Sequence, residues 1–366
     1  MKNKKIAIFH NFMDNIGGAE KVDLILAREL KADIYTTNVD KDKIKKMGFV
    51  DVLPRIHSIG KVSINPPLRQ EMAYWKFRRL NLEKKYDFYI ISGDWAMAGA
   101  LKNKPNLWYV FSPMREIWDL YDYTRKNTVG WWKKPFFDLW VFYRRSIIRR
   151  DVKNIENIIS ISENTRRRVK NYLGRDSKII YPPIETSKYS YKKNGDYWLS
   201  VNRLIHHKRV DIQMKAFGKM PSEKLIIVGS YEQSEHFKNY AAYMKKIKPE
   251  NVEIKSWVDE KELIELYSNC RGFITTSLNE DFGMNVVEAM ASGKPVIAPN
   301  EGGYKETVVN GKNGILIDDI DENKIIDAVK FIGKNPEKYK RDCIKQAKKF
   351  DTKVFIEAMK KEMKIL

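Results

Sequence analysis

The sequence predicts an α/β protein with two halves, each built around a doubly wound parallel sheet. Short apolar segments alternate with longer segments in which apolar residues recur at helical spacing, as expected for strands that alternate with helices. This series runs twice, and a segment with prolines and several polar residues, 181–196, separates the two runs. The length of 366 residues also exceeds one ordinary hydrophobic core, so two domains are expected.

The first half opens with a strand, a glycine turn and a helix. KKIAIFH (4–10) is the expected strand, and apolar residues then follow a helical spacing over 11–31. Ser162 and Gly174 are expected to cap another helix, because serine accepts N-terminal N–H groups and glycine adopts the left-handed C-cap. Further strands are expected within DIYTTNV (33–39), DFYIISG (87–93), NLWYVFSP (106–113) and NIENIISISENTRRRVKNYLG (154–174).

The second half repeats the alternation after residue 196. Its strands are expected within DYWLSVNRL (196–204), EKLIIVGSY (223–231), NVEIKSW (251–257), CRGFITTS (270–277), KPVIAPN (294–300) and NGILID (313–318), and helices within 259–269 and 284–292. We therefore expect an N-terminal domain, 1–182, a C-terminal domain, 183–345, and a last helix, 346–366, that packs back toward the N-terminal domain. A ligand would bind at the carboxyl ends of the strands, in the cleft between the halves.

Composition narrows the class of protein. Apolar residues make up 43% and charged residues 31%, which fits a globular chain without a membrane-spanning helix. The apolar run near the start is too short for a signal peptide, and Cys270 and Cys343 lack metal-type spacing, so a reducing cytoplasm is expected. The formal charge of +21 indicates an anionic partner, either nucleic acid, acidic lipid or a phosphorylated substrate, unless it only reflects a lysine-rich solvated surface.

The segment NEDFGMNVVEAMASGKPVIAPNEGG (279–303) contains two glutamates, Glu280 and Glu288. They flank a strand-to-helix turn, 282–285, whose free N–H groups suit an anion or a hydroxyl. With a helix that starts near Val286, Glu288 falls in the first turn, where it can accept hydrogen bonds from a ribose diol or simply complement the helix dipole. A hydrolytic acid–base pair needs both carboxylates at one bond, which the spacing does not indicate, so a sugar-nucleotide clamp is favoured.

Two further motifs contain groups that suit phosphates. Arg203 and Lys208 follow a strand in SVNRLIHHKRVD, and two fixed cations would stabilise a departing diphosphate, although surface cation pairs are common. The neighbouring histidines lack a third metal ligand nearby in the sequence, so we predict no metal site there. Gly17 and Gly18 in NIGGAE let a ligand approach the backbone or form a plain tight turn, since the full G-x-G-x-x-G pattern is absent.

Together these segments resemble the retaining glycosyltransferases of family 4, which have the GT-B fold of two Rossmann-like domains facing across a cleft. The resemblance covers most of the chain, and the E-x7-E arrangement is its most specific motif. It implies that Glu280 contacts the donor hexose, Glu288 holds the ribose, and Arg203 with Lys208 stabilise the leaving diphosphate. The N-terminal domain, 1–182, would bind the acceptor and the C-terminal domain, 183–345, the nucleotide sugar. Gly17 and Gly18 would lie near the donor phosphates and the acceptor. Backbone contacts with sugar and phosphate are implied for Phe282, Gly283, Met284 and Asn285, and contacts with the base for Gly229, Ser230 and Val258.

The resemblance also implies front-side transfer, in which a donor phosphate oxygen assists the acceptor hydroxyl. Neither a metal nor another cofactor would be needed, and the nucleotide sugar is a substrate. WYVFSPMREIWDLY (108–121) is similar to a segment of mannosyltransferases that build surface polysaccharides or lipid-linked glycans, except that Phe111 stands where those relatives have a histidine. GDP-mannose is therefore the first choice of donor, with UDP-sugars as the alternative. A non-catalytic donor-binding partner subunit is a further alternative; the pattern of a nucleotide-sugar 2-epimerase is not found.

A basic, aromatic segment spans 125–150. The spacing after Pro135 predicts a helix that carries an aromatic and aliphatic face, with Arg145 and Arg149 largely off it. Such a helix would place 131–150 on an anionic membrane, and the acceptor would be a glycan or a polyprenyl-phosphate-linked sugar. The protein would then be cytoplasmic and peripheral on the inner face of the membrane; alternatively, the helix packs into the N-terminal domain. No nucleic-acid module is recognised, so no nucleic-acid partner is expected. The residues expected on the apolar face are Phe136, Trp140, Tyr143 and Ile147.

Overall fold

The computed structural model describes residues 4–15, 17–229, 235–256 and 258–364. The chain forms two compact units, Met1–Tyr181 with Phe355–Leu366, and Pro182–Val354. It passes from the first unit to the second after Tyr181 and returns to the first within α14 (Thr352–Glu362). In the described part of the chain, no helix is both long and apolar enough to cross a bilayer.

The first unit contains, within its described residues, a seven-stranded sheet in which all neighbouring strands are parallel. The strand order is β3-β2-β1-β4-β5-β6-β7, so the chain reverses its direction across the sheet between β1 and β4. The edge strands β3 and β7 were not predicted, because they are short and largely exposed and so lack an apolar run. The strands are β1 Ile6–Phe9, β2 Asp33–Thr36, β3 Ile56–Ser58, β4 Phe88–Ile91, β5 Asn106–Val110, β6 Asn157–Ser160 and β7 Lys178–Ile179.

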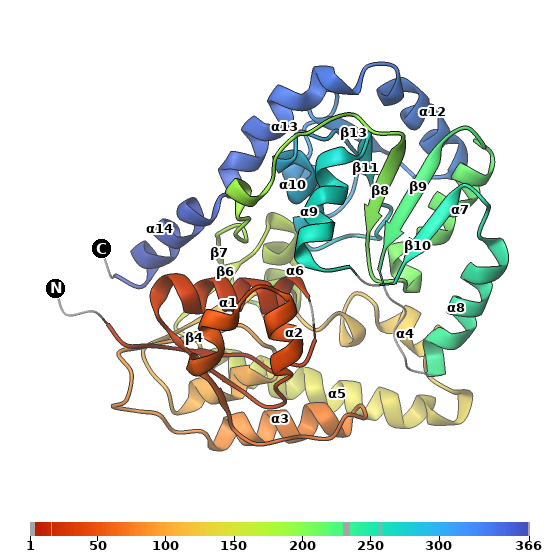
Figure 1. Cartoon of the computed structure of the whole chain (residues 1–366). Coiled ribbons are helices and arrows are strands. Elements are labelled where there is room, and N and C mark those ends of the chain that lie inside the picture. Colours follow the sequence, from red (N-terminus) through yellow and green to blue (C-terminus); the bar gives the residue numbers. More distant parts are fainter. Residues whose placement is uncertain (1–3, 16, 230–234, 257, 365–366) are drawn as a thin grey trace. The chain divides into compact units, whose positions relative to one another are not determined.

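Helices connect the strands of the first unit. They are α1 Gly18–Leu30, α2 Lys41–Lys46, α3 Leu68–Arg79, α4 Tyr121–Asn127, α5 Lys134–Asp151 and α6 Glu163–Leu173. The predicted caps of α6 are confirmed: the Ser162 hydroxyl accepts the Thr165 N–H, and Gly174 has a left-handed φ of 67°. α3 and α5 lie side by side (Figure 1), and the Trp140 indole N–H of α5 donates to the Glu71 carboxylate of α3.

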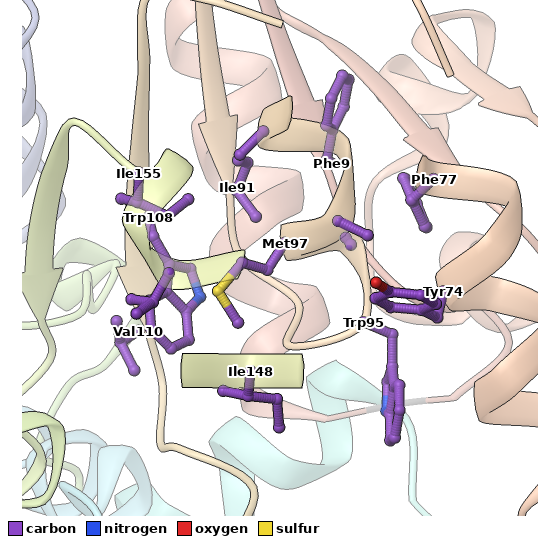
Figure 2. Packing of buried hydrophobic residues seen from close by; sticks show 14 of the residues in the cluster. Phe9, Tyr74, Phe77, Ile91, Trp95, Met97, Trp108, Val110, Ile148 and Ile155 are labelled. Carbon is purple, nitrogen blue, oxygen red and sulfur yellow. The ribbon is translucent and has the colours of Figure 1, made fainter. Parts of the chain in front are cut away.

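A hydrophobic cluster joins this sheet to α3 and α5. Figure 2 shows side chains of β1, β4 and β5 that meet those of both helices and of the turn that contains Met97. Close packing of large side chains such as Trp108 and Phe77 removes apolar surface from water and thereby fixes α5 on the unit. The packed residues include Phe9, Tyr74, Phe77, Ile91, Trp95, Met97, Trp108, Val110 and Ile148.

The predicted apolar face of α5 is only partly correct. Ile147 is buried and Trp140 packs against the cluster, whereas Phe136 and Tyr143 are exposed. The helix has apolar residues around more than half of its circumference, so the predicted face lies at the border between the side that packs on the unit and the side that faces solvent. The alternative, a helix packed into the N-terminal domain, is therefore confirmed for one side of α5.

The second unit has the same topology as the first over six strands. In its described residues the order is β10-β9-β8-β11-β12-β13, all parallel, with the reversal between β8 and β11. These findings confirm the predicted class, two α/β units each with a parallel sheet. The strands are β8 Tyr197–Val201, β9 Lys224–Val228, β10 Val252–Lys255, β11 Gly272–Ile274, β12 Val296–Pro299 and β13 Gly314–Ile317. The helices are α7 Val210–Gly218, α8 Glu235–Ile247, α9 Glu260–Asn269, α10 Met284–Ala291, α11 Tyr304–Thr307, α12 Glu322–Gly333 and α13 Lys340–Ala347.

Candidate active site

The predicted donor-binding residues of the second unit gather at the carboxyl edge of its sheet. Arg203 follows β8, and Glu280 follows β11, the two neighbouring strands between which the chain reverses direction. Gly229 and Val258 follow β9 and β10 at the same edge. In open parallel sheets, ligands bind at this reversal point because the loops of the two strands diverge there.

Lys208 and Glu280 are brought together although 72 positions separate them. The Lys208 Nζ donates to Glu280 Oε2 at 2.5 Å, and the side chains are 14% and 18% exposed. A charge-assisted hydrogen bond between partly buried groups fixes both side chains at the reversal point. Arg203 lies on the same β8–α7 loop and is exposed to solvent.

His206, on the turn before Lys208, is better suited to packing than to carrying charge. Its ring lies 4.1 Å from the ring of Tyr240, and burial lowers the pKa of His206 below its ordinary value despite the opposing charge of Asp211. The imidazole is therefore neutral near pH 7. Arg203 and Lys208 are the two cations of this loop that the sequence predicts for a diphosphate.

Arg209 is a further residue of the candidate site, and the sequence did not predict it. It has a left-handed φ of 50°, and its Nε donates to the Thr276 carbonyl at 2.6 Å. Its guanidinium also forms an ion pair with Glu301, which follows β12. Arg209 thus links the loops after β8, β11 and β12. No pattern in the sequence could have indicated this role, because the partners are far apart along the chain.

Two glycines bring the neighbouring loops into backbone contact. Gly302 has a φ of 59°, and a Cβ there would lie 2.4 Å from the Glu280 carbonyl oxygen. The next residue, Gly303, donates its N–H to that same oxygen at 2.8 Å. The loop after β12 therefore supports the backbone of Glu280, and a side chain at position 302 would push the two loops apart.

α10 begins two residues earlier than predicted. Gly283, with a φ of 86°, is its N-cap and Met284 is its first residue, so Glu288 lies beyond the first turn and the dipole argument made for it is wrong. Gly283, in its left-handed conformation, directly precedes the first residue of the helix. The spacing of apolar residues does not predict where such a turn ends. Glu288 is nonetheless buried, and its Oε2 accepts a hydrogen bond from the Tyr267 hydroxyl at 3.1 Å.

The other residues of this turn have structural contacts. Phe282 is buried and packs edge-on against Phe350 at 5.3 Å. The Asn285 side-chain amide donates to the Val201 carbonyl at 2.7 Å, which ties α10 to the end of β8. The backbone of 282–285, rather than these side chains, is what the turn offers to a ligand.

The remaining predicted residues are placed as follows. A Cβ at Gly229 would lie 1.8 Å from the Asn202 carbonyl oxygen, so the end of β9 closely approaches the residue before Arg203. Val258 is half-buried, and Ser230 lies outside the described residues. Gly17 and Gly18 belong to the first unit, as the N-cap and first residue of α1.

Comparisons with known proteins identify the part of the chain that contains these residues. Residues 184–350 match the family model described as glycosyl transferases group 1, and this segment contains the Lys208–Glu280 pair and both predicted glutamates. Residues 184–350 therefore form a glycosyl transferases group 1 domain. The chain is 26% identical to the Alpha-1,3/1,6-mannosyltransferase ALG2 of Kluyveromyces lactis, over 84% of this chain and 71% of that protein. It is 25% identical to the protein of the same name from Dictyostelium discoideum, over 86% of each chain.

The fold of the chain is GT-B. The crystal structure of Anabaena Alr3699/HepE in complex with UDP and glucose matches it with a TM-score of 0.78, over 99% of this chain and all of that one, at 17% sequence identity. At this identity the match supports the fold alone. It confirms the fold class that the sequence resemblance implied, two Rossmann-like units with parallel sheets.

Proposed function

We propose that this chain is a glycosyltransferase that transfers a hexose from a nucleotide diphosphate sugar with retention of configuration, and that the donor binds at the carboxyl edge of the second sheet. The observation that carries this proposal is the Lys208–Glu280 pair at the β8/β11 reversal point. Lys208 and Arg203 stabilise the charge that grows on the leaving diphosphate, and Glu280 accepts a hydroxyl of the sugar. Glu288 binds the ribose. Because these cations face the leaving group, the proposed reaction needs no metal.

The proposed sugar is mannose, and the first choice of donor is GDP-mannose. In support, both relatives compared above carry the name mannosyltransferase. UDP-sugars remain the alternative, because the structurally similar HepE was crystallised with UDP and glucose. The proposed acceptor is a glycan or a polyprenyl-phosphate-linked sugar.

Thermal unfolding in the presence of nucleotides tests the donor site. We expect GDP and GDP-mannose to raise the unfolding midpoint of the wild type more than UDP, ADP or their sugars do, because a ligand that binds the folded state stabilises it by RT ln(1 + [L]/Kd). Glu288→Ala is expected to lose most of the shift, and Tyr267→Phe, which leaves the carboxylate in place, to keep it.

The other outcomes of this experiment are equally informative. A selective shift by UDP would keep the activity class and replace the donor. A folded protein that shifts with no nucleotide would contradict the donor site. A shift without any donor hydrolysis or transfer would favour the non-catalytic partner subunit.

We also propose that the first unit docks on an anionic membrane through an exposed aromatic surface, defined as Trp131, Trp132, Phe136, Leu139, Phe142 and Tyr143. Trp131 is 83% exposed, and within α5 the apolar members recur at positions three, four and seven residues apart, so they share one side of the helix. Contiguous apolar side chains of this size in water mark an interaction site. Lys133 and Lys134 directly follow Trp132 in the chain, and the Lys133 ammonium lies 4.8 Å from the centroid of the Trp132 ring, so these cations suit anionic headgroups. Arg145 and Arg149 serve the fold instead, since both stack on Trp118.

Sedimentation with liposomes tests the membrane proposal. Trp131→Ser with Trp132→Ser and Phe136→Ser is expected to lower binding to anionic vesicles by about tenfold or more, because each aromatic side chain removes apolar surface from water on insertion. Phe331→Ser, at an exposed aromatic residue of α12, is the matched control and should bind as the wild type does. Trp140 is left intact because its indole hydrogen-bonds Glu71. A wild type that does not sediment with anionic vesicles, or a triple variant that sediments equally, would contradict the proposal.

A further inference from the structure

A buried polar cluster in the first unit occupies the position that corresponds to the donor site of the second. The first sheet reverses between β1 and β4, and His10 and Ser92 directly follow these two strands. α1, which follows the glycine turn after β1, adds Asp23 and Glu20. A carboxyl edge at a reversal point is where a parallel sheet binds its ligand. This edge belongs to the first unit and includes Gly17 and Gly18, which the resemblance implies lie near the donor phosphates and the acceptor. The proposed contacts with the ribose and the leaving diphosphate come from residues of the second unit.

His10 is held in its charged form. Its Nδ1 lies 2.7 Å from Asp23 Oδ2 and 3.0 Å from the Ser92 hydroxyl, which in turn donates to the same carboxylate oxygen at 2.7 Å. Burial on its own would lower the pKa of His10, but the charge and hydrogen bond of Asp23, with a smaller contribution from Glu20, outweigh it and raise that pKa to about 10. The imidazole is therefore an imidazolium at neutral pH.

Burial of this polar cluster costs free energy of folding, which a purely structural role would not explain. Asp23 is fully buried, and its Oδ1 has no hydrogen-bond partner within the described part of the chain. Buried ion pairs often stabilise a fold no better than apolar side chains of the same volume would. A charged histidine held between two carboxylates at a ligand-binding edge therefore suggests a use beyond packing.

Glu20 is the member of the cluster that a ligand can reach. Its side chain is 14% exposed, and its Oε1 lies 3.9 Å from His10 Nε2. Its Oε2 lies 2.5 Å from the point where a Cβ on Gly17 would stand, so the carboxylate extends over the glycine turn. A carboxylate fixed in this way accepts two hydrogen bonds and suits a pair of neighbouring hydroxyl groups.

We propose that Glu20, positioned by the His10 imidazolium, binds hydroxyl groups of the acceptor sugar at the carboxyl edge of the first sheet. Two carboxylates and one imidazolium give the cluster a net charge of −1, which disfavours a phosphate and favours hydroxyl donors. His10 acts through Glu20 and is a positioning residue. This proposal rests on the proposed transferase function, since it assigns a site to the second substrate of that reaction.

The test uses the full chain, the donor that stabilises it, and methyl glycosides of mannose, glucose and N-acetylglucosamine as acceptor probes. Release of the nucleotide is measured without acceptor, as hydrolysis, and with each glycoside, as transfer. At least one glycoside should accelerate release by the wild type. Glu20→Gln should raise the KM for that glycoside by roughly tenfold or more and leave hydrolysis unchanged. Glu29→Gln, at an exposed carboxylate of the same helix, is the matched control and should behave as the wild type does.

The variant His10→Gln tests whether His10 positions the Glu20 carboxylate. It should raise the KM for the glycoside in the same direction as Glu20→Gln, with kcat changed less. If this buried substitution unfolds the protein, Glu20→Gln alone decides the question. The proposal is overturned if Glu20→Gln transfers as the wild type does, if it loses hydrolysis together with transfer, or if no glycoside accelerates release by a wild type that hydrolyses donor. A wild type that neither hydrolyses donor nor shifts with nucleotide would instead contradict the proposed function.

Discussion

Lys208→Ala is expected to lower turnover by about 10²- to 10³-fold, the usual cost of removing one preorganised group that stabilises charge in the transition state. The donor carries its diphosphate charge before reaction, but more charge reaches the bridging oxygen as the bond to the sugar breaks. Lys208 should therefore act more strongly on the transition state than on the bound donor. Steady-state kinetics should show a large fall in kcat with a smaller change in the KM for donor.

Because Lys208 is hydrogen-bonded to Glu280, the variant Lys208→Ala also changes the surroundings of that carboxylate. Alanine at 208 removes the ammonium that lies 2.5 Å from the Glu280 carboxylate, and the negative charge that this cation offset then repels a diphosphate. The double variant Lys208→Ala with Glu280→Gln removes that repulsion and should recover donor affinity but not turnover. Lys219→Ala, which removes a lysine paired with Glu322 in the same unit, is the control. If the KM for donor rises while kcat stays unchanged, the lysine contributes only to binding of the donor and its assignment is wrong.

The sequence predicted that these residues would lie at one edge of the sheet because parallel topology determines their position. Once β8 and β11 are recognised as strands of one alternating α/β series, the residues after their carboxyl ends must lie at one edge of the sheet. The spacing did not predict that Lys208 and Glu280 would be hydrogen-bonded to each other, since that depends on two loop conformations. The E-x7-E resemblance predicted roles for Glu280 and Glu288. It did not predict that Glu288 is buried and accepts a hydrogen bond from Tyr267.

The features that the sequence did not predict depend on local backbone geometry. Arg209 adopts a left-handed conformation and bridges three loops, and neither property follows from residue type. Gly283 starts α10 directly after a loop, whereas the hydrophobic pattern places the start at Val286. On α5, periodicity found an apolar surface but not which part of it packs on the unit, because apolar residues occupy most of the circumference.

Glu280→Gln is expected to separate nucleotide binding from sugar transfer. In the structure Lys208 is already hydrogen-bonded to Glu280, so a diphosphate must compete with that carboxylate for the ammonium. The amide keeps the shape of the side chain and removes its charge, which leaves Lys208 available to the diphosphate. A charge-assisted hydrogen bond contributes about 1.5–3 kcal/mol, part of which the amide retains, so nucleotide diphosphate affinity should stay equal or rise up to roughly tenfold. Transfer should fall by about 10²-fold or more, because the group that accepts the sugar hydroxyl is weakened.

Calorimetric titration with the nucleoside diphosphate that stabilises the wild type, together with turnover of its sugar conjugate, measures both effects on one protein. Glu322→Gln is the matched control, because it neutralises a carboxylate paired with a lysine in the same unit at 2.6 Å and should change neither quantity. Tighter nucleotide binding with lost transfer would mean that Glu280 holds Lys208 in place until donor arrives and then turns to the sugar. Equal losses of binding and transfer would mean that Glu280 supports the nucleotide itself, and the division of roles between the two partners would have to be reversed.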